Sequence, residues 1–426
     1  MRVFPLAAIM GSLFAGHAHS AIINEDDRQD QSIEVSGGQF TPLIKVYQRY
    51  DDNVASSDID DISSWATIYE PSVSYSKQFG EFGKNSYQLD YVLAHGAFHA
   101  SDEDSYTDHD ISGKVNYEIN SRHRFVLQGG YIDSHDERGS RFSIGTGEGL
   151  TEPDTYQQFY TNLEYNYGIV EADLRLQFEY GLLDNNYDAR FVVDASGNPI
   201  DRTRERDRQT DQMLAKLYYR VGSATDLTFE AVRLDVDYDF TRTPENELSS
   251  VEMQYLLGVK WEATALTTGY AKVGYKDKNF DLNSREDHSG FEWDAQVQWE
   301  PKTYSRFKLS TGRSTQETNG EGFFVPGRNG QGYFVINTTH ELAWQHDWNN
   351  RFSTEALYRY SEDIYEGDVG EIRDDDNNGL VLKAYYDMSY WLSFTLEYVN
   401  NDRDSTRANL EYDRDLITLG VRVALK

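Results

Sequence analysis

From about residue 40 onward, apolar or aromatic residues alternate with charged or amide residues in about eighteen separate stretches. The clearest stretch is Phe291–Glu300, which reads FEWDAQVQWE. Successive side chains of a strand point to opposite faces, so the aromatic and carboxylate side chains of this stretch lie on different sides. A soluble sandwich can alternate in this way, but an outer-membrane barrel turns its apolar face to lipid and its polar face to a lumen.

The N-terminus predicts export. A short basic start at Met1–Arg2 precedes an apolar stretch, Val3–Phe14, that is too short to span a bilayer. Ala18–Ser20 has the small-x-small pattern of a cleavage site. We therefore expect a signal peptide at residues 1–20 and a mature chain that begins near Ala21.

Composition restricts how the exported chain can be stabilised. The chain has no cysteine, so neither disulfides nor thiolate metal sites can stabilise it. After the signal segment no stretch approaches the about 18 consecutive apolar residues of a membrane helix, so a membrane form has to be a barrel. The formal charge of −32 argues against nucleic acid as a partner, since phosphate binding needs a basic face.

Connections between the alternating stretches are short and long in turn. Short connections such as Asn120–Arg122 and Asn349–Asn350 alternate with long polar ones such as Ser134–Asp154 and Leu183–Thr210. Outer-membrane barrels have short periplasmic turns and long outer loops. The expected strands begin near Phe40, Trp65, Ser86, Asp110, Arg124, Thr155, Glu171, Asp211, Asp226, Ser250, Ala265, Gly290, Thr303, Tyr333, Phe352, Gly379, Trp391 and Asn409.

Tryptophans and the last stretch favour the barrel over the sandwich. Trp261, Trp299, Trp348 and Trp391 all lie beside expected short turns, where an interfacial aromatic girdle would be. The alternating Leu416–Lys426 can complete the ring and leave no unpaired edge. This end resembles the terminal signal of outer-membrane barrels, although it has aliphatic residues where aromatic ones are usual, and it implies the barrel assembly machinery as a partner.

The sequence therefore predicts an all-β protein: a transmembrane antiparallel outer-membrane barrel of about 18 strands with long acidic extracellular loops. We expect a short periplasmic segment at residues 21–39 and the barrel at residues 40–426. The location that follows is the outer membrane of a Gram-negative bacterium, in contact with its lipid.

Charged side chains on the polar face cannot all face lipid, where Arg or Lys near the midplane costs about 2–4 kcal/mol. We expect them to line a lumen or to form cross-strand ladders that hold the wall together. A mixed but mainly acidic lining would favour neutral or cationic solutes. The candidate lumen residues are Asp173, Arg175, Glu179, Glu292, Asp294, Lys383 and Glu397.

Catalytic and metal motifs are weak. His340, Glu341 and His346 do not have the spacing of a zinc protease, and no G-x-S-x-G elbow stands in a supporting context. Asp374–Gly379 matches the opening of a calcium loop, but position twelve is Tyr385 instead of Glu, so a solvated acidic loop is favoured. We expect no enzyme, no cofactor and no metal site.

Several segments resemble the putative beta-barrel porin family that is associated with exopolysaccharide gene clusters. The resemblance begins with VYQRYDDN at Val46–Asn53 and IYEPSVSY at Ile68–Tyr75, and continues through Tyr106–Asp110, Asn120–Arg124 and Asp402–Ser405. It implies a barrel that moves a secreted polysaccharide outward together with a periplasmic polysaccharide export protein. No site residue follows from it, because the matching positions are wall and turn residues.

Three functions remain open at this point. The leading hypothesis is export of an exopolysaccharide. A passive uptake porin for sugars or small solutes is the second hypothesis, and a surface-binding barrel with a plugged lumen is the third.

Overall fold

The computed structural model describes residues 32–425 except 60, 145–146, 194–196, 242–246, 265, 319–331 and 368–371. These residues form strands and short 3-10 helices, and no helix among them is long and apolar enough to cross a membrane. The expected signal peptide lies outside the described residues. The 3-10 helices are η2 (Glu81–Gly83), η3 (Asp102–Asp104), η4 (Arg141–Ser143), η5 (Gly147–Gly149), η6 (Arg204–Arg206) and η8 (Ala408–Leu410).

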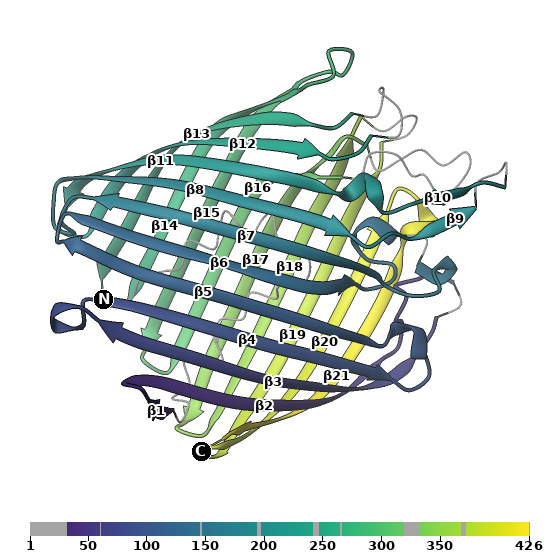
Figure 1. Cartoon of the computed structure of the whole chain (residues 1–426), viewed down its shortest axis with the longest axis horizontal. Coiled ribbons are helices and arrows are strands. Elements are labelled where there is room, and N and C mark those ends of the chain that lie inside the picture. Colours follow the sequence, from purple (N-terminus) through teal and green to yellow (C-terminus); the bar gives the residue numbers. More distant parts are fainter. Residues whose placement is uncertain are drawn as a thin grey trace.

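Long antiparallel strands make up the wall (Figure 1). The first half of the wall contains β2 (Gly38–Asp51), β3 (Ser64–Phe79), β4 (Asn85–Phe98), β5 (Tyr106–Asn120), β6 (His123–Asp136), β7 (Asp154–Tyr167), β8 (Leu174–Tyr187), β11 (Arg208–Gly222) and β12 (Thr225–Tyr238). The second half contains β13 (Ser250–Thr264), β14 (Thr267–Phe280), β15 (His288–Lys302), β16 (Ser305–Glu317), β17 (Phe334–Asn349), β18 (Phe352–Glu366), β19 (Asp374–Ser389), β20 (Leu392–Ser405) and β21 (Tyr412–Ala424).

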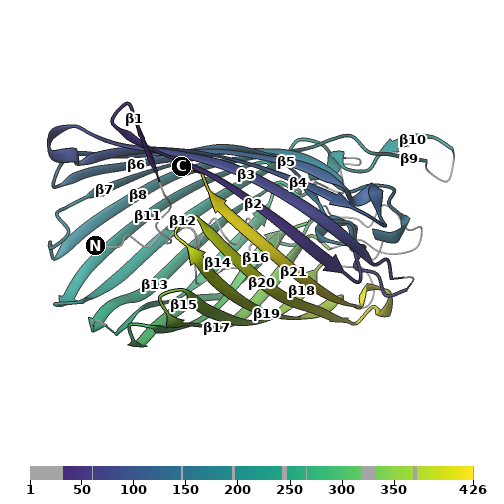
Figure 2. The same cartoon turned by 90° about the horizontal axis from the view of Figure 1, so that it is seen from below.

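The last strand closes the ring on the first. β21 pairs with β2 from Leu43 opposite Ala424 to Asp51 opposite Leu416, and the two strands lie side by side in Figure 2. The 19-stranded sheet consists of this ring of eighteen strands and β1 (Ile33–Val35), which pairs with the start of β2. Closure leaves the ring without a free edge strand, as a barrel requires. The predicted all-β barrel is therefore confirmed.

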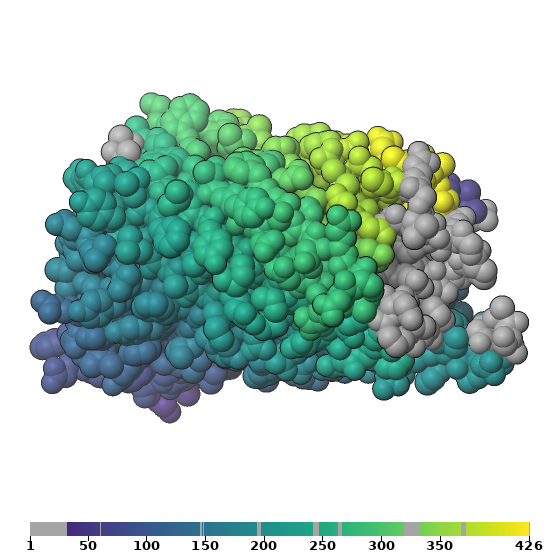
Figure 3. Space-filling view, turned by 90° about the horizontal axis from the view of Figure 1, so that it is seen from above, coloured from purple at the N-terminus to yellow at the C-terminus, as the bar shows by residue number. Residues whose placement is uncertain are grey.

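Alternation sorts the side chains of each strand between the two faces. Leu257 in the middle of β13 is 63% exposed, whereas Glu230 on the polar face of β12 is fully buried. Packed side chains of neighbouring strands form a continuous outer surface from the teal to the yellow part of the chain (Figure 3). The apolar face points outward and the polar face inward, as expected.

The short turns and the long connections lie at opposite ends of the barrel. Trp299, Trp348 and Trp391 are exposed at the turn end, where β1 and the C-terminus also lie (Figure 1). At the loop end, β9 (Phe191–Val193) and β10 (Pro199–Asp201) pair as a small hairpin. We refer to these two ends as the turn side and the loop side.

Strand starts were predicted to within about five residues, and the largest difference is Gly379 predicted against Asp374 observed. Asp374–Gly379 is therefore the start of β19, not the acidic loop that was favoured. β8 begins at Leu174 instead of at the predicted Glu171. The preceding residues form a turn in which the Ala172 N–H donates to the Ile169 carbonyl. Part of the expected periplasmic segment forms β1.

Candidate functional site

Charged side chains on the inner wall are arranged as ion pairs between strands that are adjacent or one strand apart. Glu230 of β12 lies 2.6 Å from Lys216 of β11 and 3.3 Å from Lys272 of β14, across a Gly258 that has no side chain. Lys272 also lies 3.2 Å from Asp294 of β15. Opposite charges on adjacent strands stabilise the wall and leave it polar toward the lumen.

Six of the seven candidate lumen residues lie on the inner face of a strand. Lys383 and Glu397 form an ion pair of 2.7 Å between β19 and β20, and Arg175 pairs with Asp226 at 2.5 Å. The other three are Glu179, Glu292 and Asp294. Glu179 accepts a hydrogen bond from Gln177, and a carboxylate oxygen of Glu292 lies 4.0 Å from Nζ of Lys276. Their role in transport stays a prediction.

Asp173, the seventh candidate, lies before β8 and is exposed at the turn side. The strand was predicted to start at Glu171, before β8 begins at Leu174, and Asp173 was therefore expected on the inner face of the wall. Its carbonyl accepts the Arg220 N–H at 2.8 Å, so it continues the ladder at the rim.

The loop-side ends of β16 and β17 leave the wall and lie inside the barrel. β15 and β16 pair only as far as Trp293 opposite Arg313, although both strands continue beyond this pair. Thr315 and Glu317 share a face with Leu309, which is exposed on the outside. Their side chains nevertheless reach inner-face residues of other strands.

Two polar contacts hold this bent end. The Thr315 hydroxyl donates to Glu252 of β13 at 2.5 Å, and Lys278 of β14 pairs with Glu317 at 2.6 Å. Since neither strand is a neighbour of β16 in the ladder, β16 has to cross the inner face of β14 and β15. The bend therefore narrows the lumen.

An apolar contact reinforces the bend. Phe280 of β14 packs with Phe334 and Ile336 of β17, and all three are buried. The Tyr238 hydroxyl of β12 donates to the Thr318 carbonyl at 2.6 Å. Burial of these aromatic side chains favours the inward position, because it removes a large apolar area from water.

Trp293 shares the outer face of β15 with Phe291 and Trp299 but is less exposed than either. Phe291 and Trp299 are exposed, but Trp293 is half-buried where β16 separates from β15. Its indole N–H donates to the Thr311 hydroxyl at 3.1 Å, and the Arg313 guanidinium lies 5.9 Å from the ring centroid.

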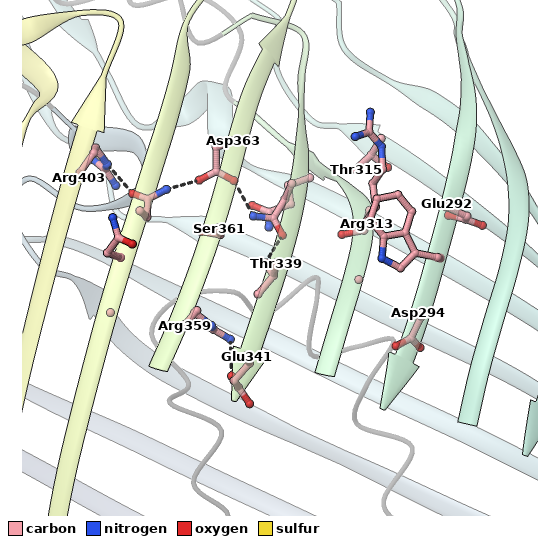
Figure 4. Close-up of a pocket in the computed structure, with 18 of the residues that line it drawn as sticks. Glu292, Asp294, Arg313, Thr315, Thr339, Glu341, Arg359, Ser361, Asp363 and Arg403 are labelled. Carbon is pink, nitrogen blue, oxygen red and sulfur yellow. Dashed lines mark hydrogen bonds and ion pairs between the residues drawn. The ribbon is translucent and has the colours of Figure 1, made fainter. Parts of the chain in front are cut away.

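A cavity of about 430 Å³ lies against this part of the inner wall. One side is made by β12–β15, with Leu234, Glu252, Lys272, Glu292 and Asp294. Figure 4 shows Glu292 and Asp294 on that side, and Thr339, Ser361, Asp363 and Arg403 on the strands beyond β16, which form the second side. β16 lies between the two sides.

A chain of hydrogen bonds fixes the polar side chains of the second side. Arg403 donates to Asn377 at 2.9 Å, and Asn377 donates to Asp363 at 2.9 Å. Asn337 donates to the other carboxylate oxygen of Asp363 at 2.6 Å (Figure 4). Four strands, β17 to β20, contribute to this chain, which holds the amides in fixed orientations.

Loops cover part of the loop-side mouth. Arg414 at the start of β21 bonds Asp51 at 3.0 Å and Glu137 at 2.7 Å, and thereby fastens the loop after β6 to the closing strands. In that loop the buried Arg138 donates to Asp104 at 2.7 Å, and these hydrogen bonds raise the pKa of Arg138 above its usual value.

Sequence reasoning missed Asn337, Ser361, Asn377 and Gly379 as cavity residues. Each is polar or small on a strand that alternates normally, so only the register of three strands, β17 to β19, brings them together. Among the described residues no group of three or more His, Asp or Glu side chains could hold a metal ion. The arrangement presents hydrogen-bond donors, hydrogen-bond acceptors and paired charges toward the interior of the ring.

Several solved structures are similar to this barrel at low sequence identity. The structure titled OccAB4 of Acinetobacter baumannii matches with 13% identity and a TM-score of 0.49, over 93% of this chain and 99% of that one. OccK3 (OpdO) of Pseudomonas aeruginosa matches with 13% identity and a TM-score of 0.45, over 91% and 96%.

The siderophore receptor PirA of Acinetobacter baumannii matches with 8% identity and a TM-score of 0.49, over 91% of this chain and 80% of that one. No curated protein matches the chain. The model of one family, described as Putative beta-barrel porin 2, matches residues 35–425. Its match covers the whole ring, so this chain is an outer-membrane barrel of a Gram-negative bacterium and belongs to the Putative beta-barrel porin 2 family.

Proposed function

We propose that the protein is a passive, water-filled channel for small hydrophilic solutes across the outer membrane. The observation that carries this proposal is the inner wall, where ion pairs such as Lys216–Glu230 and Lys383–Glu397 face the interior of a ring that is apolar outside. Rings of 16–18 strands are wide enough to leave an aqueous path.

The bent end of β16 and β17 limits the size of the solutes that can pass through the channel. It lies across the inner face of β14 and β15, held by Lys278–Glu317 and by Phe280 against Phe334. A constriction made by ordered strands favours small solutes over a wide polymer. The uptake porin that the sequence left as its second hypothesis therefore becomes the leading one.

Charge decides which small solutes enter. The chain has 72 Asp and Glu against 40 Lys and Arg, and the inner wall holds both signs in pairs. An acidic excess lowers the energy of a cation in the channel and raises that of a free anion. The expected order of permeation is cations and neutral solutes before anions.

Reconstitution tests the channel. Purified protein in planar lipid bilayers is expected to produce stepwise conductance, and proteoliposomes are expected to swell in solutions of small sugars at a rate that falls with solute size. A surface-binding barrel with a plugged lumen would give neither signal.

Export of an exopolysaccharide together with a periplasmic export protein remains a second candidate, supported by the resemblance of segments such as Val46–Asn53 and Asp402–Ser405. Deletion of the gene is then expected to lower cell-surface polysaccharide. Unchanged surface polysaccharide, in a strain without a second such barrel, would exclude it. Neighbouring genes for glycosyltransferases would support export, whereas catabolic genes would support uptake.

A further inference from the structure

A row of apolar side chains crosses the inner wall from β17 to β21. Ala343, Leu357, Val381, Val399 and Leu416 are direct partners in successive strand pairs and form one cluster. On the same strands the row lies among ion pairs and amides such as Lys383–Glu397 and Asn377. Two of them, Leu357 and Val381, form an apolar floor of the cavity.

Gly379 of β19 lies next to Val381 on the same face of the strand, and because glycine has no side chain it leaves a notch beside this apolar floor. A Cβ atom built there would meet its nearest neighbours, Asn401 Oδ1 and Arg359 Cβ, at 3.5 and 3.9 Å, which is ordinary contact. Glycines at 258 and 274 on the inner face are different, because a Cβ would meet atoms at 2.7 and 2.1 Å. Packing therefore requires glycine at those two positions but not at Gly379.

A strand glycine that is not required by packing weakens the strand, and it often marks a place where a ligand approaches the backbone. Gly312 of β16 also lines the cavity, and a Cβ atom built there would meet the Trp293 carbonyl oxygen at 3.6 Å, which is ordinary contact. The two glycines leave backbone accessible on two sides of the same space.

Amide and hydroxyl groups border the notch. Ser361 and Asn377 stand one row toward the loop side of Arg359 and Gly379, and Asn401 is the direct partner of Gly379. The Arg403–Asn377–Asp363–Asn337 chain holds the amides in place. Amides and hydroxyls both donate and accept hydrogen bonds, which suits a ligand with many hydroxyl groups.

Charges around the notch already have partners. Glu341 lies 3.5 Å from Arg359 and 3.9 Å from Lys308, and Asp363 accepts from two amides (Figure 4). On the facing side Asp294 pairs with Lys272 at 3.2 Å. A charged ligand would have to compete with these pairs, whereas a neutral ligand would not.

We propose that the Gly379 notch is a binding subsite for neutral polyhydroxylated solutes of one or two sugar rings. The carbon-bound hydrogens of a ring lie on Leu357 and Val381, and its hydroxyl groups exchange hydrogen bonds with Ser361, Asn377 and Asn401. The cavity of about 430 Å³ holds a solute of this size. This inference rests on the proposed channel and names its substrate class.

Block of single-channel current by added sugar tests the subsite. Maltose is expected to reduce the current of the wild-type channel saturably, while sodium gluconate and lysine at equal concentration have much weaker effects. Gly379→Leu fills the notch and is expected to raise the half-blocking maltose concentration at least about tenfold, which corresponds to about 1.4 kcal/mol.

Ala94→Leu is the matched control, because it adds the same side chain on β4, whose residues do not line the cavity. It is expected to leave maltose block unchanged. Heat-modifiable migration on gels and an open conductance close to that of the wild type establish that both variants fold. A second variant, Asn377→Leu, keeps the notch open but removes its amide and is expected to weaken block.

Each outcome separates the two proposals. A folded, inserted protein that gives no single-channel current contradicts the proposed function itself. Conductance without saturable maltose block, or block that survives in Gly379→Leu, overturns the subsite and leaves the channel proposal intact. Equal block by gluconate or lysine overturns the neutral substrate class.

Discussion

At the scale of single residues, we expect substitutions that break a buried ion pair of the inner wall to lower the free energy of unfolding most. Glu230 is fully buried between Lys216 and Lys272, so Glu230→Ala leaves two ammonium groups on the inner wall without this carboxylate. The expected loss is roughly 3–5 kcal/mol in the free energy of unfolding. Urea unfolding of the barrel in lipid vesicles measures it.

Asp235→Ala is the control for that experiment. The Arg233–Asp235 pair is on the outer side with much of both side chains exposed, so its removal is expected to cost less than about 1 kcal/mol. Equal losses in the two variants would contradict the assignment of the inner wall as the more buried face.

Asp207, in the connection before β11, links loop order to pH. Burial raises the pKa of its carboxyl to about 6, and the Tyr187 N–H donates to it at 2.7 Å. Because the folded pKa exceeds the unfolded value, the folded loop binds more protons between about pH 4 and 6, and its stability falls as pH rises through that range.

Amide hydrogen exchange of Tyr187, corrected for intrinsic rates, is therefore expected to show less protection at pH 7 than at pH 4. Asp207→Asn cannot titrate and serves as the control, in which protection is expected to be equal at both pH values. A wild-type protection factor that does not change between the two pH values would contradict the raised pKa.

At the scale of strands, the two faces of β13 should respond differently to the same substitution. Leu257→Arg places a charge in lipid near the middle of the strand and is expected to cost about 2–4 kcal/mol. Gln254→Arg adds the charge on the inner face beside Glu252 and is expected to cost less. Equal costs in urea unfolding would contradict the orientation of the strand.

The bent end of β16 and β17 should limit conductance. Glu317→Ala removes the ion pair with Lys278 and is expected to increase single-channel conductance, because the end is held less firmly across the lumen. Glu397→Ala breaks a wall pair of similar length, Lys383–Glu397, and is the control. A larger increase in the control would show that the bend is not the constriction.

Strands were predictable from the sequence because alternation is a local property, and the terminal stretch Leu416–Lys426 indicated closure. The error at β8 arose from a turn at Ile169–Ala172 that has no strong turn residue after Gly168. The bend could not be predicted, since Thr315 and Glu317 alternate like any strand and their partners lie two or three strands away.

At the scale of the whole molecule, closure turns a set of amphipathic strands into an inside and an outside. The charged candidates Arg175, Lys383 and Glu397 could be placed on the inner face from the two-residue alternation of their strands alone. The cavity could not be predicted, because the row that contains Leu357 and Val381 depends on the register of neighbouring strands. The substrate class depends on that register as well.

Conductance of the purified protein in a planar lipid bilayer tests the central claim most directly. A water-filled ring with an acidic excess is expected to give discrete current steps proportional to voltage, with a reversal potential in a salt gradient that favours cations. A folded protein that inserts but gives no steps, or gives steps selective for anions, would contradict the account.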